Sequence, residues 1–262
     1  MTQKIVRNET KSSGRIFNLK SIKALLPPHA HNLCARRMIQ KFLLELSETP
    51  TPKVLIIGSG QGGVGCELLD ELDHICQINL DIYPYPGIDL LADAHSLPLP
   101  DNSQDGIIIQ AVLEHVLSPN QVIKEIERVL KPNGLIYSET PFMQMVHEKQ
   151  FDYTRYTDLG HRYLFRNFEQ IDRAITGGPG MTLLWAWCYF LRSFFNTWVG
   201  CQFGFAVGRL TGFWLLWIDL LLVRMNHPAA YDAASGYGFL GRKKIGPSLT
   251  QRDLIKTFRG FK

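Results

Sequence analysis

The chain has 262 residues, of which 45% are hydrophobic and 20% are charged. This length and composition are typical of a globular protein with a sizeable core. The formal net charge of +4 is too small to indicate nucleic-acid recognition, so we expect no nucleic-acid partner. The five cysteines form no CxxC motif and no cluster with histidine, which argues against a disulfide framework and a zinc site. We therefore predict a reducing, cytoplasmic compartment and no bound metal.

The N-terminal region, residues 1–49, is expected to be a basic polar arm followed by an amphipathic helix. Residues 1–15 lack the apolar segment of a secretory signal, so none is predicted. Apolar residues from Leu33 to Leu46 recur at helical spacing, and the TPTP stretch at 49–52 ends that helix.

Strand patterns alternate with helix patterns over residues 53–142. The run KVLIIG at 53–58 is continuously apolar, as in a strand that is buried on both faces of a parallel sheet. Further strands are predicted at 75–81, 88–93, 106–111 and 135–142, and helices at 64–72 and 119–130. This alternation indicates an open α/β sheet with right-handed crossovers.

The first strand runs into a glycine-rich turn, VLIIGSGQGGVG at 54–65. Gly58, Gly60 and Gly63 satisfy GxGxxG, and glycines let the backbone turn tightly and approach a ligand at a helix N-terminus. Asp81 ends the next strand, where a carboxylate can bind both hydroxyls of a ribose. The same residues would also suit a turn without a ligand and a plain surface acid. If a ligand binds, a dinucleotide and an adenosine sulfonium are both compatible with this turn.

Downstream residues distinguish these ligands. The segments ADAHSLPLPDNSQDGI at 92–107, LEHV at 113–116 and ERVLKPNG at 127–134 follow the glycine turn in order. Together they resemble the class I S-adenosylmethionine-dependent methyltransferases of the type-11 (UbiE-like) branch, in an uncharacterised subgroup. The resemblance implies a Rossmann-like, doubly wound α/β fold whose mostly parallel seven-stranded sheet has an antiparallel last strand. It also implies S-adenosyl-L-methionine as the cofactor and a small-molecule methyl acceptor.

The family pattern implies which residues hold the cofactor. The turn residues would wrap its methionine part and ribose, and these residues are Gly58, Ser59, Gly60 and Gly62. Asp81 would bind the ribose hydroxyls, and Ile82 would lie against the adenine.

Four later positions complete the implied site. Asp93 would accept a hydrogen bond from the adenine amino group, and the backbone N–H of Ala94 would donate one. Gln110 would form the floor of the methionine pocket. His115 would either face the pocket or cap the following helix.

One position departs from the family pattern. The family usually has an acid two positions before the first glycine, which helps to anchor the amino group of the cofactor, and this chain has Ile56 there. An unpaired ammonium group in a partly buried pocket is costly. We therefore expect another acid to replace it, and the candidates are Glu114 and Glu139.

The segment TPFMQMVHEKQFDYTRYTDLGHRYLF at 140–165 carries the candidate catalytic residues, and similar PF…H…DYxRYT stretches recur among type-11 relatives. His147 would act as a base, Asp152 would orient it, and Arg155 would clamp an anionic acceptor. Tyr153 and Tyr156 could form a wall near the sulfonium. In the structural alternative, Asp152 and Arg155 only pair to fix the loop, and His147 is a hydrogen-bonded loop residue.

Strands six and seven are expected at 168–176 and 233–243, with an apolar insertion between them. Residues 181–224 contain all five tryptophans, and glycines recur every four residues from Gly200 to Gly212, a spacing that lets helices approach closely. This segment is either a soluble lid or homodimer element, or it contacts the inner face of a membrane peripherally. Its uncharged runs are shorter than a membrane span, and Asp219 interrupts the second one.

We therefore predict a methyltransferase domain at residues 50–246, with a helical insertion at about 178–228 and a basic C-terminal tail at 247–262. The predicted function is S-adenosylmethionine-dependent O- or C-methylation of a small, apolar or amphipathic acceptor. Two alternatives are an NAD-dependent oxidoreductase with the same fold and a non-catalytic, membrane-associated relative. The missing acid at position 56 would favour the non-catalytic relative.

Overall fold

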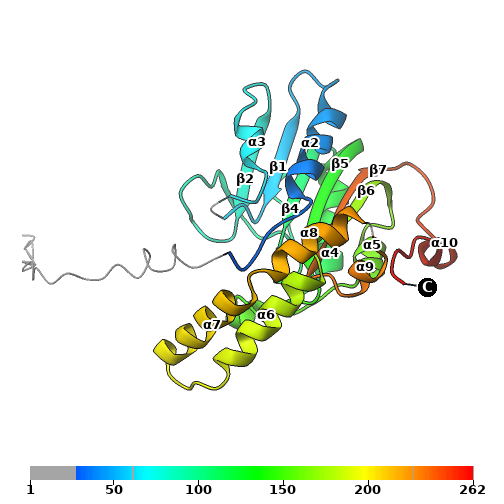
Figure 1. Ribbon diagram of the computed structural model, residues 1–262. Helices are drawn as coiled ribbons and strands as arrows, with labels where there is room; N and C mark the ends of the chain where they lie inside the picture. Colours follow the sequence, from blue (N-terminus) through cyan, green and yellow to red (C-terminus); the bar gives the residue numbers. More distant parts are fainter. Residues whose placement is uncertain (1–27, 61, 226, 262) are drawn as a thin grey trace, which may run out of the picture.

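The computed structural model describes residues 28–60, 62–225 and 227–261, so the predicted basic arm at 1–20 lies outside the described residues. A seven-stranded sheet forms the centre, with the order β3-β2-β1-β4-β5-β7-β6 (Figure 1). Its strands are β1 (Lys53–Ile57), β2 (Cys76–Asp81), β3 (Leu90–Leu91), β4 (Gln104–Gln110), β5 (Leu130–Pro141), β6 (Phe168–Gly177) and β7 (Gly236–Lys243). Strands β1 to β5 pair in parallel, and β7 runs antiparallel between β5 and β6. The predicted doubly wound sheet with an antiparallel last strand is confirmed.

Helices cover both faces of the sheet. Successive side chains of a strand point to opposite faces, so Leu55 and Ile57 pack in one buried cluster and Val54 and Ile56 in the other. The first cluster includes side chains of α4 (Pro119–Val129) and α5 (Asp158–Leu164). The second includes side chains of α2 (Ala35–Leu46) and α3 (Glu67–Asp70). The parallel strands all end at the same edge, where ligands bind in open α/β sheets.

Two predicted elements are shorter than expected. The helix predicted at 64–72 is only α3, because Gly62 and Gly65 adopt left-handed backbone angles (φ +102° and +88°) that hold the chain out of a helix. The strand predicted at 88–93 is only β3. On both sides of it an aspartate side chain binds a backbone N–H: Asp89 accepts from Asn79, and Asp93 accepts from His95.

The predicted helical insertion between β6 and β7 is confirmed. It consists of α6 (Pro179–Arg192), α7 (Trp198–Gly212), α8 (Leu215–Arg224) and α9 (Ala229–Asp232). Helices α6 and α7 form a hairpin that extends from the body of the molecule (Figure 1). A Cβ at Gly208 would lie 2.6 Å from Cα of Cys188 in α6, and one at Gly204 would lie 2.7 Å from the carbonyl oxygen of Leu191. The glycine spacing therefore allows the close approach of α7 to α6.

Asp219 connects α8 to the start of α6. In the sequence this acid interrupts an apolar run, and in the structure its side chain is fully buried. It accepts hydrogen bonds from the backbone N–H groups of Gly178, Gly180 and Met181, at 3.0, 2.6 and 2.8 Å. Since these donors belong to the first turn of a helix, the carboxylate acts as its N-terminal cap.

The predicted basic tail packs against the domain. Its helix α10 (Gln251–Lys256) begins after Thr250, whose side chain accepts from the backbone N–H of Asp253. Further on, Arg259 donates to the carbonyl oxygen of Arg173, and the N–H of Phe261 donates to Asp232. These contacts tie the tail to β6 and α9.

Candidate functional site

The glycine turn is built around left-handed glycines. Gly58 and Gly60 have φ values of +67° and +50°, a region that side chains with a Cβ rarely adopt. The N–H groups of Gly58 and Ser59 both donate to the carbonyl oxygen of Leu80 at the end of β2. A Cβ at Gly58 would lie 2.2 Å from the Val112 side chain. The turn therefore lies directly over the ends of β2 and β4.

A cavity of about 500 Å³ opens on one side of this turn. Six of the residues predicted to hold the cofactor line it: Gly58, Asp81, Ile82, Asp93, Ala94 and His115. His147 and Tyr153 line it too, so the predicted cofactor and catalytic segments meet there. Tyr156 does not line the cavity and packs against the core, where burial raises its pKa to about 12. Of the two predicted wall tyrosines, only Tyr153 is placed to contact a ligand.

Two aspartates of this cavity are fixed by backbone donors. Asp81 is buried; its Oδ2 accepts from the N–H of Gly60 at 2.9 Å and its Oδ1 from the N–H of Tyr83 at 3.0 Å. Asp93 is exposed, and Oδ1 accepts from the N–H of His95, which lowers the pKa of this carboxyl. His95 in turn accepts from the N–H of Ser118, the residue before α4. Sequence reasoning missed His95, which links Asp93 to α4.

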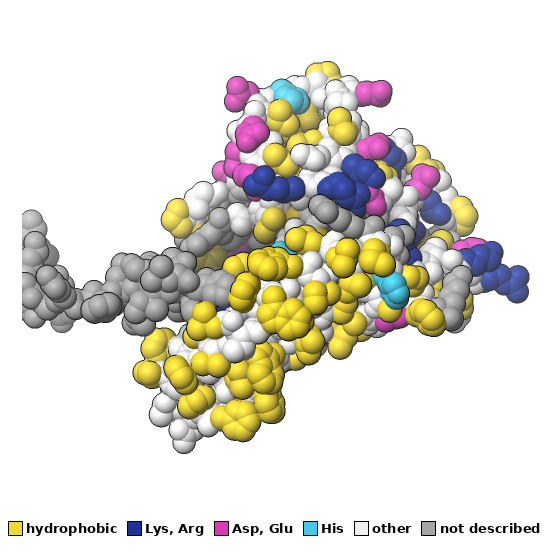
Figure 2. Space-filling model, viewed as in Figure 1, with side chains coloured by type: hydrophobic (Ala, Val, Ile, Leu, Met, Phe, Trp, Pro, Cys, Tyr) yellow, Lys and Arg dark blue, Asp and Glu magenta, His cyan; other side chains and the backbone are white. Residues whose placement is uncertain are grey.

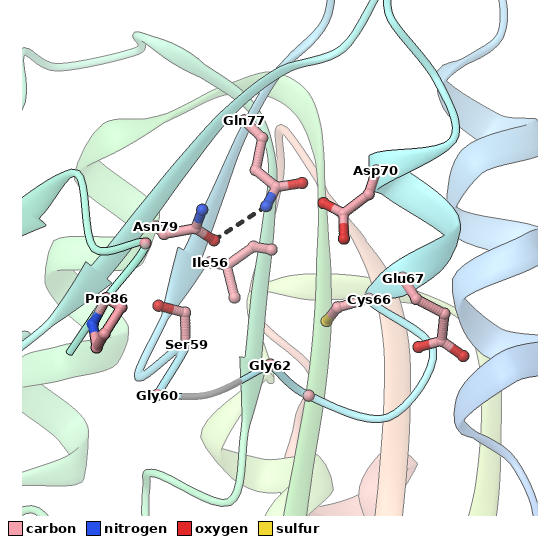
Figure 3. Close-up of a pocket in the computed structure, with 12 residues that line it drawn as sticks. Ile56, Ser59, Gly60, Gly62, Cys66, Glu67, Asp70, Gln77, Asn79 and Pro86 are labelled. Atoms are coloured by element: carbon pink, nitrogen blue, oxygen red, sulfur yellow. Dashed lines mark hydrogen bonds between the residues drawn. The ribbon is translucent and has the colours of Figure 1, made fainter.

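The turn also borders a second cavity, of about 620 Å³, between β1, β2 and α3 (Figure 3). Ser59, Gly60 and Gly62 line it, together with Ile56 on its floor. The Ser59 hydroxyl is buried and has no hydrogen-bond partner among the described residues. No atom in the described part of the chain lies within 4 Å of where a Cβ of Gly62 would be. An unpaired hydroxyl beside open backbone fits a polar ligand on this turn.

Gln110 connects the turn to Glu139. Its side-chain N–H donates to the carbonyl oxygen of Val64 and to Oε2 of Glu139, both at 3.1 Å. Its Oε1 would lie 2.1 Å from a Cβ at Gly63 and accepts from the thiol of Cys66. Gln110 therefore lies beneath the turn, but it lines neither of the two cavities, and its role as the floor of the methionine pocket stays a prediction.

Glu139 lies on the same face of the sheet as Ile56. It accepts from Asn32 at 2.9 and 3.0 Å and also from the Tyr137 hydroxyl. Burial raises its pKa, and the hydrogen bonds from Tyr137, Asn32 and Gln110 oppose this effect. Sequence reasoning missed Asn32, because its partner lies 107 positions away and no local pattern signals the pair.

The predicted catalytic residues come together in the loop around the short helix η1 (Lys149–Phe151). Both oxygens of Asp152 are bound by the Arg155 guanidinium, which lowers the pKa of Asp152 to about 2. Asp152 also accepts from the backbone N–H of His147 at 2.8 Å. The neighbouring Glu114 carboxylate raises the pKa of His147, and burial opposes it. The pairing of Asp152 with Arg155 leaves the guanidinium little capacity to clamp an anion.

His115 lines the 500 Å³ cavity. Its Nδ1 lies 2.7 Å from the carbonyl oxygen of Phe151, and its ring packs edge-on against that of His147 with centroids 4.8 Å apart. The residue that precedes α4 is Ser118. His115 therefore faces the cavity and does not cap the helix.

The strand order and the glycine turn at the strand ends define the class I methyltransferase fold. Residues 55–138 match the family described as "Methyltransferase domain". Over these residues the chain is similar to the class I S-adenosylmethionine-dependent methyltransferases of the type-11 branch, whose cofactor is S-adenosylmethionine.

Two curated relatives match parts of the chain. A demethylmenaquinone methyltransferase of Lysinibacillus sphaericus is 41% identical over 56 residues, 21% of this chain and 24% of the relative. A malonyl-[acyl-carrier protein] O-methyltransferase of Marinomonas is 28% identical over 120 residues, 39% of this chain and 43% of the relative. The chain spans less than half of the length of these relatives.

Solved structures share the fold. A putative sarcosine dimethylglycine methyltransferase from Galdieria sulphuraria has a TM-score of 0.52 and 18% identity, covering 80% of this chain and 84% of that one. The [4+2]-cyclase SpnF has a TM-score of 0.50 and 18% identity, covering 87% and 92%. One of these two proteins is a cyclase by name, so the fold alone does not specify methyl transfer.

Proposed function

We propose that this protein transfers a methyl group from S-adenosylmethionine to a small-molecule acceptor held in the 500 Å³ cavity. The observation that carries the proposal is the pair of Asp81 and the glycine turn. A buried carboxylate is held at the end of β2 by the N–H of Gly60, next to a turn that a polar ligand fits. The family uses the same arrangement for the ribose and methionine parts of the cofactor.

Six of the predicted cofactor residues have the following places in this proposal. Asp81 binds the ribose hydroxyls, while the exposed Ile82 and the Asp93–Ala94 backbone hold the adenine. On the other side of the turn, Ser59 and Gly62 hold the methionine part.

Glu139 takes the place of the acid that is absent at position 56. It shares the sheet face of Ile56 and bonds to Gln110, which supports the turn. The other candidate, Glu114, has the imidazoles of His115 and His147 as its neighbours instead. Since the oxygens of Glu139 already accept several bonds, we propose that it acts through Gln110.

The bound cofactor supplies a methyl group activated by a sulfonium, so the protein's task is to align the acceptor and exclude water. His147 and Tyr153 border the cavity at the acceptor side. Where the acceptor carries a hydroxyl, His147 takes its proton, and Asp152 holds the loop in place through the His147 N–H. Arg155 neutralises Asp152. The acceptor atom is oxygen or carbon.

Calorimetry with S-adenosylhomocysteine tests the proposal. Asp81→Ala removes hydrogen bonds to a charged group, each of which is worth about 1.5–3 kcal/mol, so affinity should fall at least about tenfold. The matched control is Asp89→Ala, which also removes an acceptor of a backbone N–H near β2 but lies on the exposed surface. NADH should give no heat. Absence of binding by the wild type, or equal affinities in the two variants, would overturn the proposal.

The hairpin suggests a second partner. Hydrophobic side chains gather over α6, α7 and α8 (Figure 2), and the exposed ones include Phe194, Trp198, Val199, Phe203 and Trp217. Among the described residues, no single helix is long and apolar enough to cross a membrane. The bent pair Trp198–Gly212 and Leu215–Val223, which meet at 51°, passes that test jointly by length and composition.

We propose that this face contacts a membrane surface, with the aromatic rings at the level of the headgroups, and that the acceptor is apolar or amphipathic. The triple variant Trp198→Ser, Phe203→Ser and Trp217→Ser should stop the protein from floating with liposomes. A control carries Leu44→Ser and Ile245→Ser, which remove exposed apolar side chains outside the hairpin. Flotation that the triple variant retains would refute membrane contact, and dimerisation lost in that variant would assign the face to a homodimer.

A further inference from the structure

Three potential metal ligands converge beside the acceptor side of the cavity. Oε1 of Glu114 lies 3.6 Å from Nε2 of His115 and 3.7 Å from Nε2 of His147. One ligand atom from each residue lies within 4.8 Å of the other two. We propose that Glu114, His115 and His147 bind a divalent transition-metal ion of the zinc type.

Glu114 is a buried acid that faces two imidazoles without a hydrogen bond to either. Its side chain is fully buried, and neither carboxylate oxygen has a hydrogen-bond partner among the described residues. A buried carboxylate that makes no hydrogen bond is costly. The distances to the two imidazoles are too long for direct hydrogen bonds. They are close to the separation of about 3.3 Å between two ligands that each lie about 2.0–2.1 Å from a tetrahedral ion.

The imidazoles are oriented for metal binding. Nδ1 of His115 lies 2.7 Å from the carbonyl oxygen of Phe151 and can donate to it. Nδ1 of His147 lies 3.3 Å from the carbonyl oxygen of Met145 and 3.5 Å from a carboxylate oxygen of Asp152. Metal-binding histidines typically donate the other ring N–H to a carbonyl or carboxylate. In this cluster both Nδ1 atoms have such a neighbour, and both Nε2 atoms are left facing Glu114.

The donor set and its location indicate what the ion would bind. Two histidines and one glutamate form a known three-ligand set of catalytic zinc, which keeps a fourth position open. His115 and His147 line the 500 Å³ cavity, so the open position would face the acceptor. An acceptor with an oxygen donor, such as a phenol, an enol or a carboxylate, fits this position. This inference about the acceptor rests on the proposed function. When the ion is bound, His147 is a metal ligand and does not act as the base.

Metal titration of the purified full chain tests the site. We expect one Co²⁺ or Zn²⁺ per chain, and a Co²⁺ absorption spectrum typical of four ligands. Glu114→Gln and His115→Ala should each weaken Co²⁺ affinity by roughly 100-fold or more, because removal of a residue that only supports a ligand already costs 10–100-fold. Using two variants covers the case in which one of them fails to fold. The double variant His74→Ala and Cys76→Ser, which removes exposed donors elsewhere, should bind as the wild type does.

The outcomes separate this inference from the proposed function. S-adenosylhomocysteine affinity, measured on the same preparations, should not change in Glu114→Gln. If S-adenosylhomocysteine fails to bind while one metal ion still binds, the cofactor assignment fails and the metal site stands. Absence of stoichiometric binding, or equal Co²⁺ affinity in the wild type and both cluster variants, would overturn the metal site.

Discussion

Replacement of Asp219 by alanine should destabilise the hairpin strongly. The carboxylate accepts from three buried backbone N–H groups at the start of α6. Hydrogen bonds to a charged group contribute about 1.5–3 kcal/mol each, but three bonds to one cap are not additive, and water can enter the vacated space. We therefore expect the free energy of unfolding to fall by about 3 kcal/mol, above the usual 0.5–2 kcal/mol for an N-cap.

Urea denaturation measures this effect, because all five tryptophans lie between residues 181 and 224 and their fluorescence reports the hairpin. Circular dichroism follows the whole chain. In Asp219→Ala the fluorescence transition should precede the dichroism transition, since local unfolding breaks two-state behaviour. The control is Asp253→Ala, which removes a half-buried acid from the first turn of α10. A loss under about 0.5 kcal/mol, or one equal to the control, would refute the capping role.

Further predictions concern the pH dependence of stability, the packing of the hairpin and the role of Glu139 beneath the glycine turn. Burial lowers the pKa of His161 to about 3, against about 6.5 in the unfolded chain. The unfolded state therefore binds the proton first, and stability falls below pH 6.5 by up to about 1.4 kcal/mol per pH unit. His161→Gln should reduce the loss between pH 7 and pH 5 by about 2 kcal/mol in urea titrations, and an unchanged loss would contradict the assignment. Gly208→Val should lower hairpin stability by about 1–3 kcal/mol, because its Cβ meets backbone in α6, whereas the exposed Leu210→Val should not; equal melting curves would disprove the close contact. Glu139→Gln should weaken S-adenosylhomocysteine binding by about tenfold, since an amide cannot accept from all its present donors, and unchanged calorimetry would exclude Glu139 as the replacement acid.

Much of the sheet was predictable because its strands are long apolar runs between clear turns. Residues 53–57 of the run KVLIIG form β1, and residues 106–110 of the strand predicted at 106–111 form the end of β4. The mispredicted elements are those in which local features oppose regular structure: left-handed glycines before α3, and competing side chains around β3. Near β3, Asp89 and Asp93 bind backbone N–H groups, and a strand pattern cannot show that competition.

The candidate site was predictable where residues are close in sequence or follow a family pattern. Gly58, Asp81 and Asp93 fall on one cavity because the ends of parallel strands meet. Long-range partners could not be predicted. Asn32 reaches Glu139, and Asp219 reaches the start of α6, through contacts that depend on how separate elements pack. The cluster of Glu114 and His147 could not be predicted for the same reason, because the two residues lie in different loops and meet only in the folded chain.

The short stretch at 28–34 contacts both the helical hairpin and the region beneath the glycine turn. The carbonyl of His29 accepts from the Trp185 indole in the hairpin, and the His31 ring lies 3.3 Å from Asp219. One residue further, Asn32 holds Glu139 beneath the glycine turn. The same few peptide units therefore connect the start of the hairpin to the carboxylate beneath the glycine turn.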